Sequence, residues 1–169
     1  MPSTPPPGIV VDDSACHVDD LAPCGGVAVL TPGDQDWDTF VDLAVDSSWP
    51  GLEALGGAAE TVAGAVREEA TRFGQEVFAA VASVRTWDRA QDRQQTLAWG
   101  DCGFGTDRPR LQETLPGGDL RYEMLEVSWL FKLGDLTAPV RDPELARLLA
   151  VEPGARVPLA GVLDVIPAS

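Results

Sequence analysis

The sequence predicts an α+β domain in which an antiparallel β-sheet is flanked by helices. Three observations favour this class: strand-like and helix-like segments are mixed along the chain, neighbouring strand-like segments are separated by hairpin-length turns, and no segment repeats. Apolar residues make up 44% of the 169 residues, which is enough to build a core. We expect a single domain over residues 26–169, preceded by a Pro-rich and acidic lead-in over residues 1–25.

The first expected elements are a strand and a helix. Residues 26–31 (GVAVLT) are strand-like and are followed by a Pro-Gly turn signal. Apolar residues then recur at helical spacing over residues 37–44, and Asp34 or Asp36 is suited to the N-terminal end of that helix.

A second helix is expected over residues 59–73. Its apolar residues form one stripe, and Glu68 and Arg72 are spaced as a favourable ion pair one turn apart. Gly74 is placed like a C-terminal cap. The segment therefore has the features of a complete amphipathic helix.

The second half of the chain is expected to complete the sheet and to end in helices. A strand over residues 77–87 and a short one over 96–99 are separated by a polar turn, which predicts a hairpin. Residues 101–119 are loop-like, and residues 121–132 alternate as a strand does, with Leu125, Val127, Trp129 and Phe131 on one face. Two short helices are expected over residues 142–150 and 159–166.

The charge balance excludes several classes of partner. The chain has 27 acidic and 12 basic residues, a net charge of −15, and Lys132 is its single lysine. Such a chain repels phosphate backbones and anionic lipids, so we expect no nucleic-acid partner and no membrane partner. No apolar run approaches the roughly 18–20 residues that cross a bilayer, and no secretory signal is recognisable. Three cysteines are too few for a disulfide framework, which favours a cytoplasmic protein.

The residues alone do not identify a reaction. An acidic segment with two cysteines and the single histidine is a candidate metal site, but it lacks a second tight pair of ligands, so we expect no metal and a solvated loop. The segment comprises Asp12, Asp13, Cys16, His17, Asp19, Asp20 and Cys24. Cys102 follows Asp101, a setting that raises a thiol pKa, and is interpreted as a core residue. The glycine pairs are too short to cradle a phosphate.

Several segments, taken in order, resemble the UDP-N-acetylmuramate dehydrogenase family, also called UDP-N-acetylenolpyruvoylglucosamine reductase. The resemblance covers roughly residues 26–163. The segments are DWDTFVDLAV (36–45), PGLEALGG (50–57), FGQEV (73–77), SVRTWDRA (83–90), QTLAWGDCGFG (95–105), RYEMLEVSWLF (121–131) and LTAPVRDPELARLLAVEPGARVPLAGV (136–162). The resemblance implies a sheet like that of the second subdomain of an FAD-binding domain of the PCMH, or vanillyl-alcohol-oxidase, type.

The chain departs from that family at the positions where the resemblance implies contacts with flavin and substrate. The family's flavin-binding subdomain and its substrate domain with a catalytic Ser and Glu have no expected counterpart here. Asp107 stands where the family has an Arg that polarises the substrate. Residues 57–77 have lost the family's Gly, Pro, Asn and Tyr at the positions of Glu60, Val66, Glu69, Thr71 and Phe73. We therefore expect a helix in place of a flavin-binding loop, with no FAD, no NADPH and no reductase activity.

Two main functional hypotheses follow. In the first, the former flavin cleft holds a hydrophobic small molecule and the protein is a cofactor-independent cyclase, isomerase or lyase of specialised metabolism, with Glu69, Arg72, Asp107 and Arg110 as candidate catalytic residues. In the second, the domain is a non-catalytic binding or regulatory module and these four charges are solvated. A residual FAD-dependent role and a decayed fragment are the remaining alternatives. In the family, other subdomains cover the faces of this domain. We expect this chain to bury the same apolar faces by self-association, as a homodimer.

Overall fold

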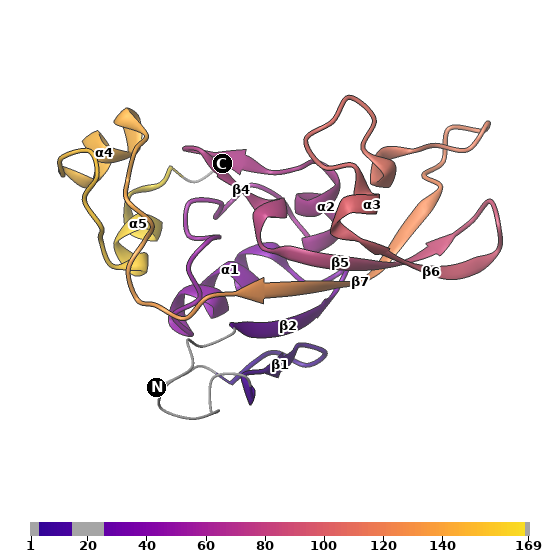
Figure 1. Ribbon diagram of the computed structural model, residues 1–169, viewed down its shortest axis with the longest axis horizontal. Coiled ribbons are helices and arrows are strands. Elements are labelled where there is room, and N and C mark those ends of the chain that lie inside the picture. The colour runs from indigo at the N-terminus through magenta and orange to yellow at the C-terminus, as the bar shows by residue number, and fades with distance from the viewer. Residues whose placement is uncertain (1–3, 15–25, 168–169) are drawn as a thin grey trace.

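The computed structural model describes residues 4–14 and 26–167, and its centre is a five-stranded antiparallel sheet in the order β1-β2-β7-β5-β6 (Figure 1). The strands are β1 (Val10–Asp12), β2 (Val27–Pro32), β5 (Val81–Asp88), β6 (Arg93–Ala98) and β7 (Tyr122–Phe131). Helices lie on one face and at one end of this sheet (Figure 1). The predicted α+β class with an antiparallel sheet is therefore confirmed.

The main core lies between the sheet and α1 (Trp37–Asp46). Phe40 of α1 contacts Trp129 of β7 with ring centroids 5.1 Å apart, and Trp37 lies 6.3 Å from the same indole. The indole N–H of Trp129 donates to Thr31 Oγ1 at 2.9 Å, which satisfies a polar atom in an apolar interior. This layer confirms the predicted strand and helix at the start of the domain.

The N-terminus of α1 follows from its capping residue. The Asp36 side chain accepts a hydrogen bond from the Thr39 amide at 2.8 Å, so Asp36 is the N-cap among the two predicted candidates. The backbone amide of Trp37 donates to Glu60 O at 3.0 Å. The start of α1 is thereby joined to the segment that precedes α2 (Val62–Arg67).

The predicted helix over residues 59–73 is wrong in its length. Helix α2 spans only Val62–Arg67, and Glu69 adopts a left-handed conformation with φ of 51°. The Glu69 and Ala70 amides donate to Val66 O and Ala65 O, the two bonds of a Schellman motif. The position that usually holds glycine in this motif is Glu69 here, so the sequence contains no visible stop.

The residues after α2 form a hairpin instead of a last helical turn. Strands β3 (Thr71–Arg72) and β4 (Gln75–Glu76) pair antiparallel, and Gly74, with φ of +77°, lies in their turn rather than at a helix cap. The predicted Glu68–Arg72 ion pair is absent because the two residues do not share a helix.

The β5–β6 hairpin is confirmed, and β7 pairs with both β5 and β2. Residues Val77–Ala79 form a 3-10 turn before β5, and Trp99–Cys102 form the short helix α3 where a loop was expected to follow β6. In β7, Thr86 pairs with Met124 and Arg85 pairs with Glu126, so Leu125 is an extra residue in the strand. The predicted phase of Leu125 with Val127 is wrong for this reason.

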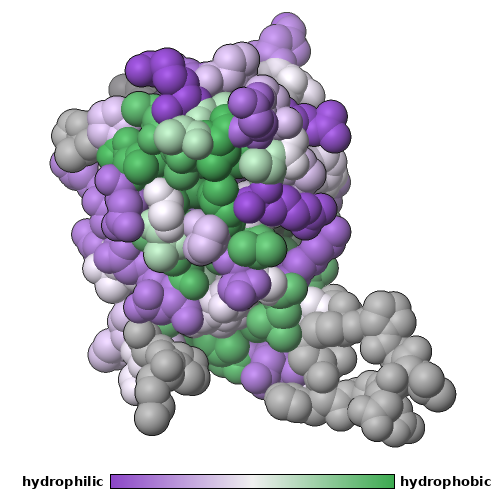
Figure 2. Space-filling view, turned by 90° about the vertical axis from the view of Figure 1, so that its left-hand side faces the viewer, coloured by the Kyte–Doolittle hydropathy of each residue, from purple (hydrophilic) through white to green (hydrophobic). Residues whose placement is uncertain are grey.

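The two C-terminal helices are confirmed as α4 (Pro143–Leu149) and α5 (Leu159–Val165). They lie beyond one end of the sheet (Figure 1), and apolar residues gather on the upper part of that end in Figure 2. A second, smaller core beneath them comprises Ala54, Val140, Leu145, Ala146 and Val162.

The segment before residue 26 contributes to the sheet where the structure describes it. Ile9 is buried, and β1 pairs antiparallel with β2, with Val10 opposite Leu30. The boundary between a lead-in and a domain at residue 26 stays a prediction. Within the described ranges, no helix has the length and hydropathy needed to cross a membrane.

Candidate functional site

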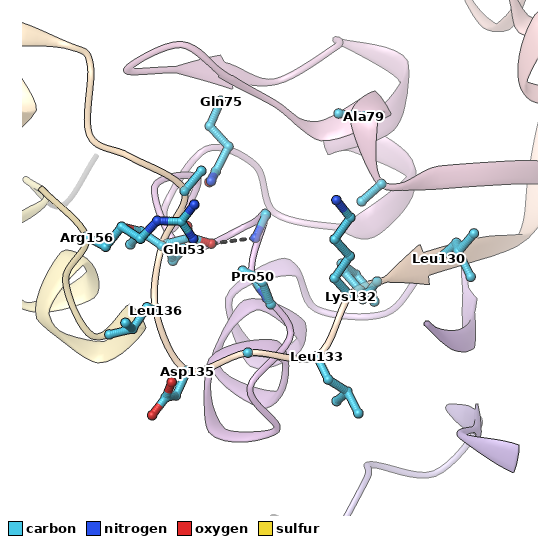
Figure 3. Close-up of a pocket in the computed structure, with 16 residues that line it drawn as sticks. Pro50, Glu53, Gln75, Ala79, Leu130, Lys132, Leu133, Asp135, Leu136 and Arg156 are labelled. Carbon is cyan, nitrogen blue, oxygen red and sulfur yellow. Dashed lines mark hydrogen bonds between the residues drawn. The ribbon is translucent and has the colours of Figure 1, made fainter. Parts of the chain in front are cut away.

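A cleft lies between the body of the domain and the segment that leads to α4. It consists of two adjoining cavities of about 620 and 670 Å³, whose shared lining residues define what we call the Glu53 cleft. Figure 3 shows the first of these cavities. The shared residues are Gly51, Glu53, Gln75, Ala79, Thr137 and Ala138. Each cavity has the volume of a small-ligand site.

Backbone hydrogen bonds hold the walls of the cleft in place. Leu130, near the end of β7, donates its amide to Ala80 O, and Gly134 donates to Ser48 O, each at 2.9 Å. Thr137 and Val157 exchange hydrogen bonds through the Thr137 amide at 2.9 Å and the Thr137 hydroxyl at 3.3 Å. The segment after β7 is therefore fastened at both of its ends, with the cleft beside it.

Glu53 places a buried carboxylate in this cleft. The residue is 3% exposed, and its Oε2 accepts a hydrogen bond from the Gly51 amide at 2.6 Å. Among the described residues, no hydrogen bond to Oε1 is found, and this atom is not fully enclosed. A buried carboxylate with a free acceptor atom favours a ligand that carries a hydrogen-bond donor.

Other polar groups reach the same cleft from different walls. The Gln75 side chain accepts a hydrogen bond from the Ala54 amide at 2.8 Å and thereby fixes β4 beside the Glu53 loop. Lys132 follows β7 directly and Arg156 precedes α5, and both line one of the two cavities (Figure 3). Three elements that are distant in sequence therefore direct polar side chains to one place.

The four residues predicted as catalytic lie outside the Glu53 cleft and are not brought together. The Gly105 amide donates to both Glu69 carboxylate oxygens at 3.3 Å, and the Arg72 guanidinium donates to Gly56 O and Pro167 O at 3.2 and 3.1 Å. Arg110 Nε donates to the Tyr122 hydroxyl at 3.0 Å, and Asp107 is exposed in the loop after α3. Glu69 contacts the loop after α3 through Gly105, and Asp107 and Arg110 belong to that loop, but no printed hydrogen bond or ion pair joins any two of the four residues.

The residues that line the cleft were not predicted as a site from the sequence. Glu53 lies within PGLEALGG, where one acidic residue interrupts an apolar run, and that pattern was a usable signal for a buried carboxylate. Lys132 was noted as the single lysine. No sequence pattern joins either residue to Arg156, which lies 24 positions beyond Lys132 in the printed sequence.

In the segment expected to have lost flavin contacts, the backbone amides donate hydrogen bonds to other groups of the protein. The Val62 and Ala63 amides donate to Gln35 O and Gly33 O at 2.9 and 2.8 Å. The Gly64 amide donates to the Thr61 hydroxyl, which caps α2, at 3.1 Å. The amides of Ala65, Glu68, Glu69 and Ala70 donate within the helix and its C-terminal turn. A phosphate-binding loop instead requires several free amides directed at the anion.

The described part of the chain contains no site suited to a reactive cysteine or to a metal ion. Burial raises the pKa of the Cys102 thiol to about 11, which confirms the expected direction and disfavours a nucleophilic thiolate. Residues 4–14 and 26–167 contain no group of three His, Cys, Asp or Glu side chains arranged for a metal. Much of the acidic segment considered as a metal site, including Cys16, His17 and Cys24, lies outside the described residues.

The resemblance to UDP-N-acetylenolpyruvoylglucosamine reductases is confirmed by comparison with curated proteins. The reductase of Cutibacterium acnes is 38% identical over 147 residues, which is 87% of this chain and 38% of the relative. Those of Thermobifida fusca and Salinispora arenicola are 34% and 31% identical over 92% and 79% of this chain, and 41% and 36% of their own length. No family model matches the chain. The chain thus spans about two fifths of the length of the curated relatives it matches.

Proposed function

We propose that this protein is a flavin-free small-molecule-binding protein derived from a reductase of this kind, and that the Glu53 cleft is its ligand site. The observation that carries the proposal is the buried Glu53 carboxylate, which lines both cavities and whose Oε1 has no hydrogen-bond partner among the described residues. The ligand has an apolar body with a hydroxyl or amino group that donates to Oε1. The apolar lining includes Pro50, Phe73, Ala80, Leu130, Phe131, Pro139, Val140 and Val162.

The absence of flavin is part of the proposal and is supported by the segment at residues 57–77. Its amides are used internally, and the Glu69 carboxylate already accepts the Gly105 amide. A carboxylate at that amide competes with an anionic phosphate for the same donor and repels it. Asp107 adds a further negative charge in the same loop. These residues do not fit a pyrophosphate, so no step of the proposed function uses flavin.

The buried carboxylate also favours a second candidate function, which is catalysis of a cofactor-independent cyclisation, isomerisation or elimination. An acid or base in an apolar cleft is the minimum requirement for such proton transfers. Glu53 is the residue placed for that role, because it contacts the cleft directly. A non-catalytic binding module uses the same cleft without turnover, so both functions predict binding and differ only in product formation.

Binding in the cleft is tested with Nile red, a neutral dye whose fluorescence rises in apolar surroundings. Ala79 lines both cavities, so the Ala79→Trp substitution fills the cleft and is expected to weaken dye binding by about tenfold or more. Ala90→Trp, in the exposed turn between β5 and β6, is the matched control and should leave the affinity unchanged. Equal affinity in all three proteins would contradict the cleft as the ligand site.

The role of Glu53 is tested by competition between octan-1-ol and its methyl ether, which lacks the hydroxyl donor. In the unsubstituted protein the alcohol should displace Nile red about tenfold better, since a hydrogen bond to a charged acceptor contributes about 1.5–3 kcal/mol. Glu53→Gln keeps the size of the side chain but removes its charge, and should reduce that preference to about threefold or less. An unchanged preference would show that Glu53 does not receive the donor.

A further inference from the structure

Two basic side chains line the cavity that contains Glu53. The chain has 12 basic residues against 27 acidic ones, and its single lysine, Lys132, is one of the two. The other is Arg156, which comes from the segment before α5. The same cavity is also lined by two carboxylates, Glu53 and Asp135, so in a protein of net charge −15 its lining is locally balanced in charge.

Neither cation is engaged by another residue that the structure describes. Among residues 4–14 and 26–167, no salt bridge and no side-chain hydrogen bond involves Lys132 or Arg156, and both residues are exposed. The other charged residue on this stretch, Asp135, directs its carboxylate away from the Lys132 ammonium in Figure 3. The positive charges are therefore available to a ligand.

The two side chains approach the cavity from opposite sides. In Figure 3, Arg156 extends from the α5 side toward Glu53, Lys132 extends upward from the end of β7, and an open space separates the two side chains. Gln75 lies above that space and Pro50 below it in the same view. An ammonium and a planar guanidinium facing one space are suited to an oxyanion with two or three oxygens.

From this arrangement we propose that the Glu53 cleft takes a small organic anion, with its carboxylate or phosphate head between Lys132 and Arg156 and its apolar tail against the cleft lining. The proposal rests on the proposed function, because it names the ligand class of the same cleft. Glu53 is buried on the cleft floor, so it receives the ligand's hydroxyl or amino donor while the cations at the rim hold the anionic head.

The test is displacement of Nile red by octanoate, octyl phosphate and the neutral methyl octanoate, which has no hydrogen-bond donor. In the unsubstituted protein, octanoate or octyl phosphate should displace the dye about tenfold better than methyl octanoate, and added salt should reduce the difference. Lys132→Gln and Arg156→Gln should each lower the preference to about threefold, and the double variant should abolish it. A preference for only one of the two anions would identify the head group as carboxylate or as phosphate.

Arg147→Gln is the matched control because it removes the same charge from an exposed position on α4 that does not line the cleft. It should keep the full preference for the anion. Equal displacement by octanoate, octyl phosphate and methyl octanoate, or an equal loss in Arg147→Gln, would overturn the anion site while dye binding still supports the cleft. If Nile red does not bind at all, the proposed function fails first and the anion site fails with it.

Discussion

At the scale of single residues, the partly buried ion pair between Asp88 and Arg121 holds the long loop before β7 to the β5–β6 hairpin. Arg121 donates from Nε and Nη2 to the two Asp88 oxygens at 3.0 and 2.9 Å, and Asp88 is completely buried. The same guanidinium donates to Glu113 at 3.1 Å and lies 4.9 Å from the Tyr122 ring centroid. Asp88 also accepts the Ala90 amide, so one carboxylate organises both the pair and the turn.

Asp88→Asn should therefore destabilise the protein in a pH-dependent way. The substitution leaves Arg121 without its partner and should lower the melting temperature by about 6–12 °C near pH 7. The Arg121 hydrogen bonds lower the pKa of Asp88 below its ordinary value of 3.8, so the stabilisation is complete above that value and is lost as the pH falls through the lowered pKa. The difference between the two proteins should shrink in that range.

Thermal unfolding followed by circular dichroism at several pH values measures this effect. Glu123→Gln is the matched control, since it breaks the exposed Arg89–Glu123 pair at 3.3 Å and should change the melting temperature by only about 1–2 °C. A melting temperature of Asp88→Asn equal to that of the control at pH 7 would show that the partly buried pair has no special contribution.

At the scale of elements, the spacing of apolar residues predicted a helix or strand correctly where one spacing continues without interruption. Helix α1 has a long apolar face and a side-chain cap at Asp36, and both were visible in the sequence. Helix α2 was overextended because its Schellman motif has Glu69, not glycine, in the left-handed position. In β7, Met124 and Leu125 are both apolar, so the alternating pattern does not reveal which is the extra residue.

The segment from α2 through the β3–β4 hairpin also decides the prediction about flavin. Because its amides are internally bonded and Glu69 accepts the Gly105 amide, the purified protein should show no absorbance near 450 nm, and adding FAD should not change its melting temperature. Glu69→Asn removes the repelling charge but not the internal hydrogen bonds, so it too should remain colourless. Bound flavin in the purified protein would overturn the flavin-free proposal.

At the scale of the whole molecule, the fold class could be predicted but the cleft could not. The Glu53 cleft is built from the loop after α1, the β3–β4 hairpin, the end of β7 and the segment before α5. Local patterns identify each of these elements separately, whereas their juxtaposition depends on how the segment after β7 turns back toward Glu53. The predicted residues Glu69, Arg72, Asp107 and Arg110 were chosen for their charge changes and not for such a juxtaposition.

The whole molecule also presents an apolar surface at the end formed by α4 and α5 (Figure 2). Leu149, Val157, Val165 and Ile166 pack against the small second core but remain partly exposed. Because this second core is small, apolar area around it stays exposed to water. Association of two copies would bury that area. We propose that two copies associate through this α4–α5 surface as a homodimer with a two-fold axis.

Size-exclusion chromatography with light scattering should then give twice the 17.9 kDa mass of one chain. Val165→Glu places a charge within the α4–α5 surface and should weaken the dimer about tenfold or more, because a buried unpaired charge is costly. Val10→Glu is the matched control: Val10 is 57% exposed on β1 at the edge of the sheet, away from α4 and α5. A monomeric unsubstituted protein would contradict the dimer, and dissociation by Val10→Glu alone would move the interface to the sheet edge.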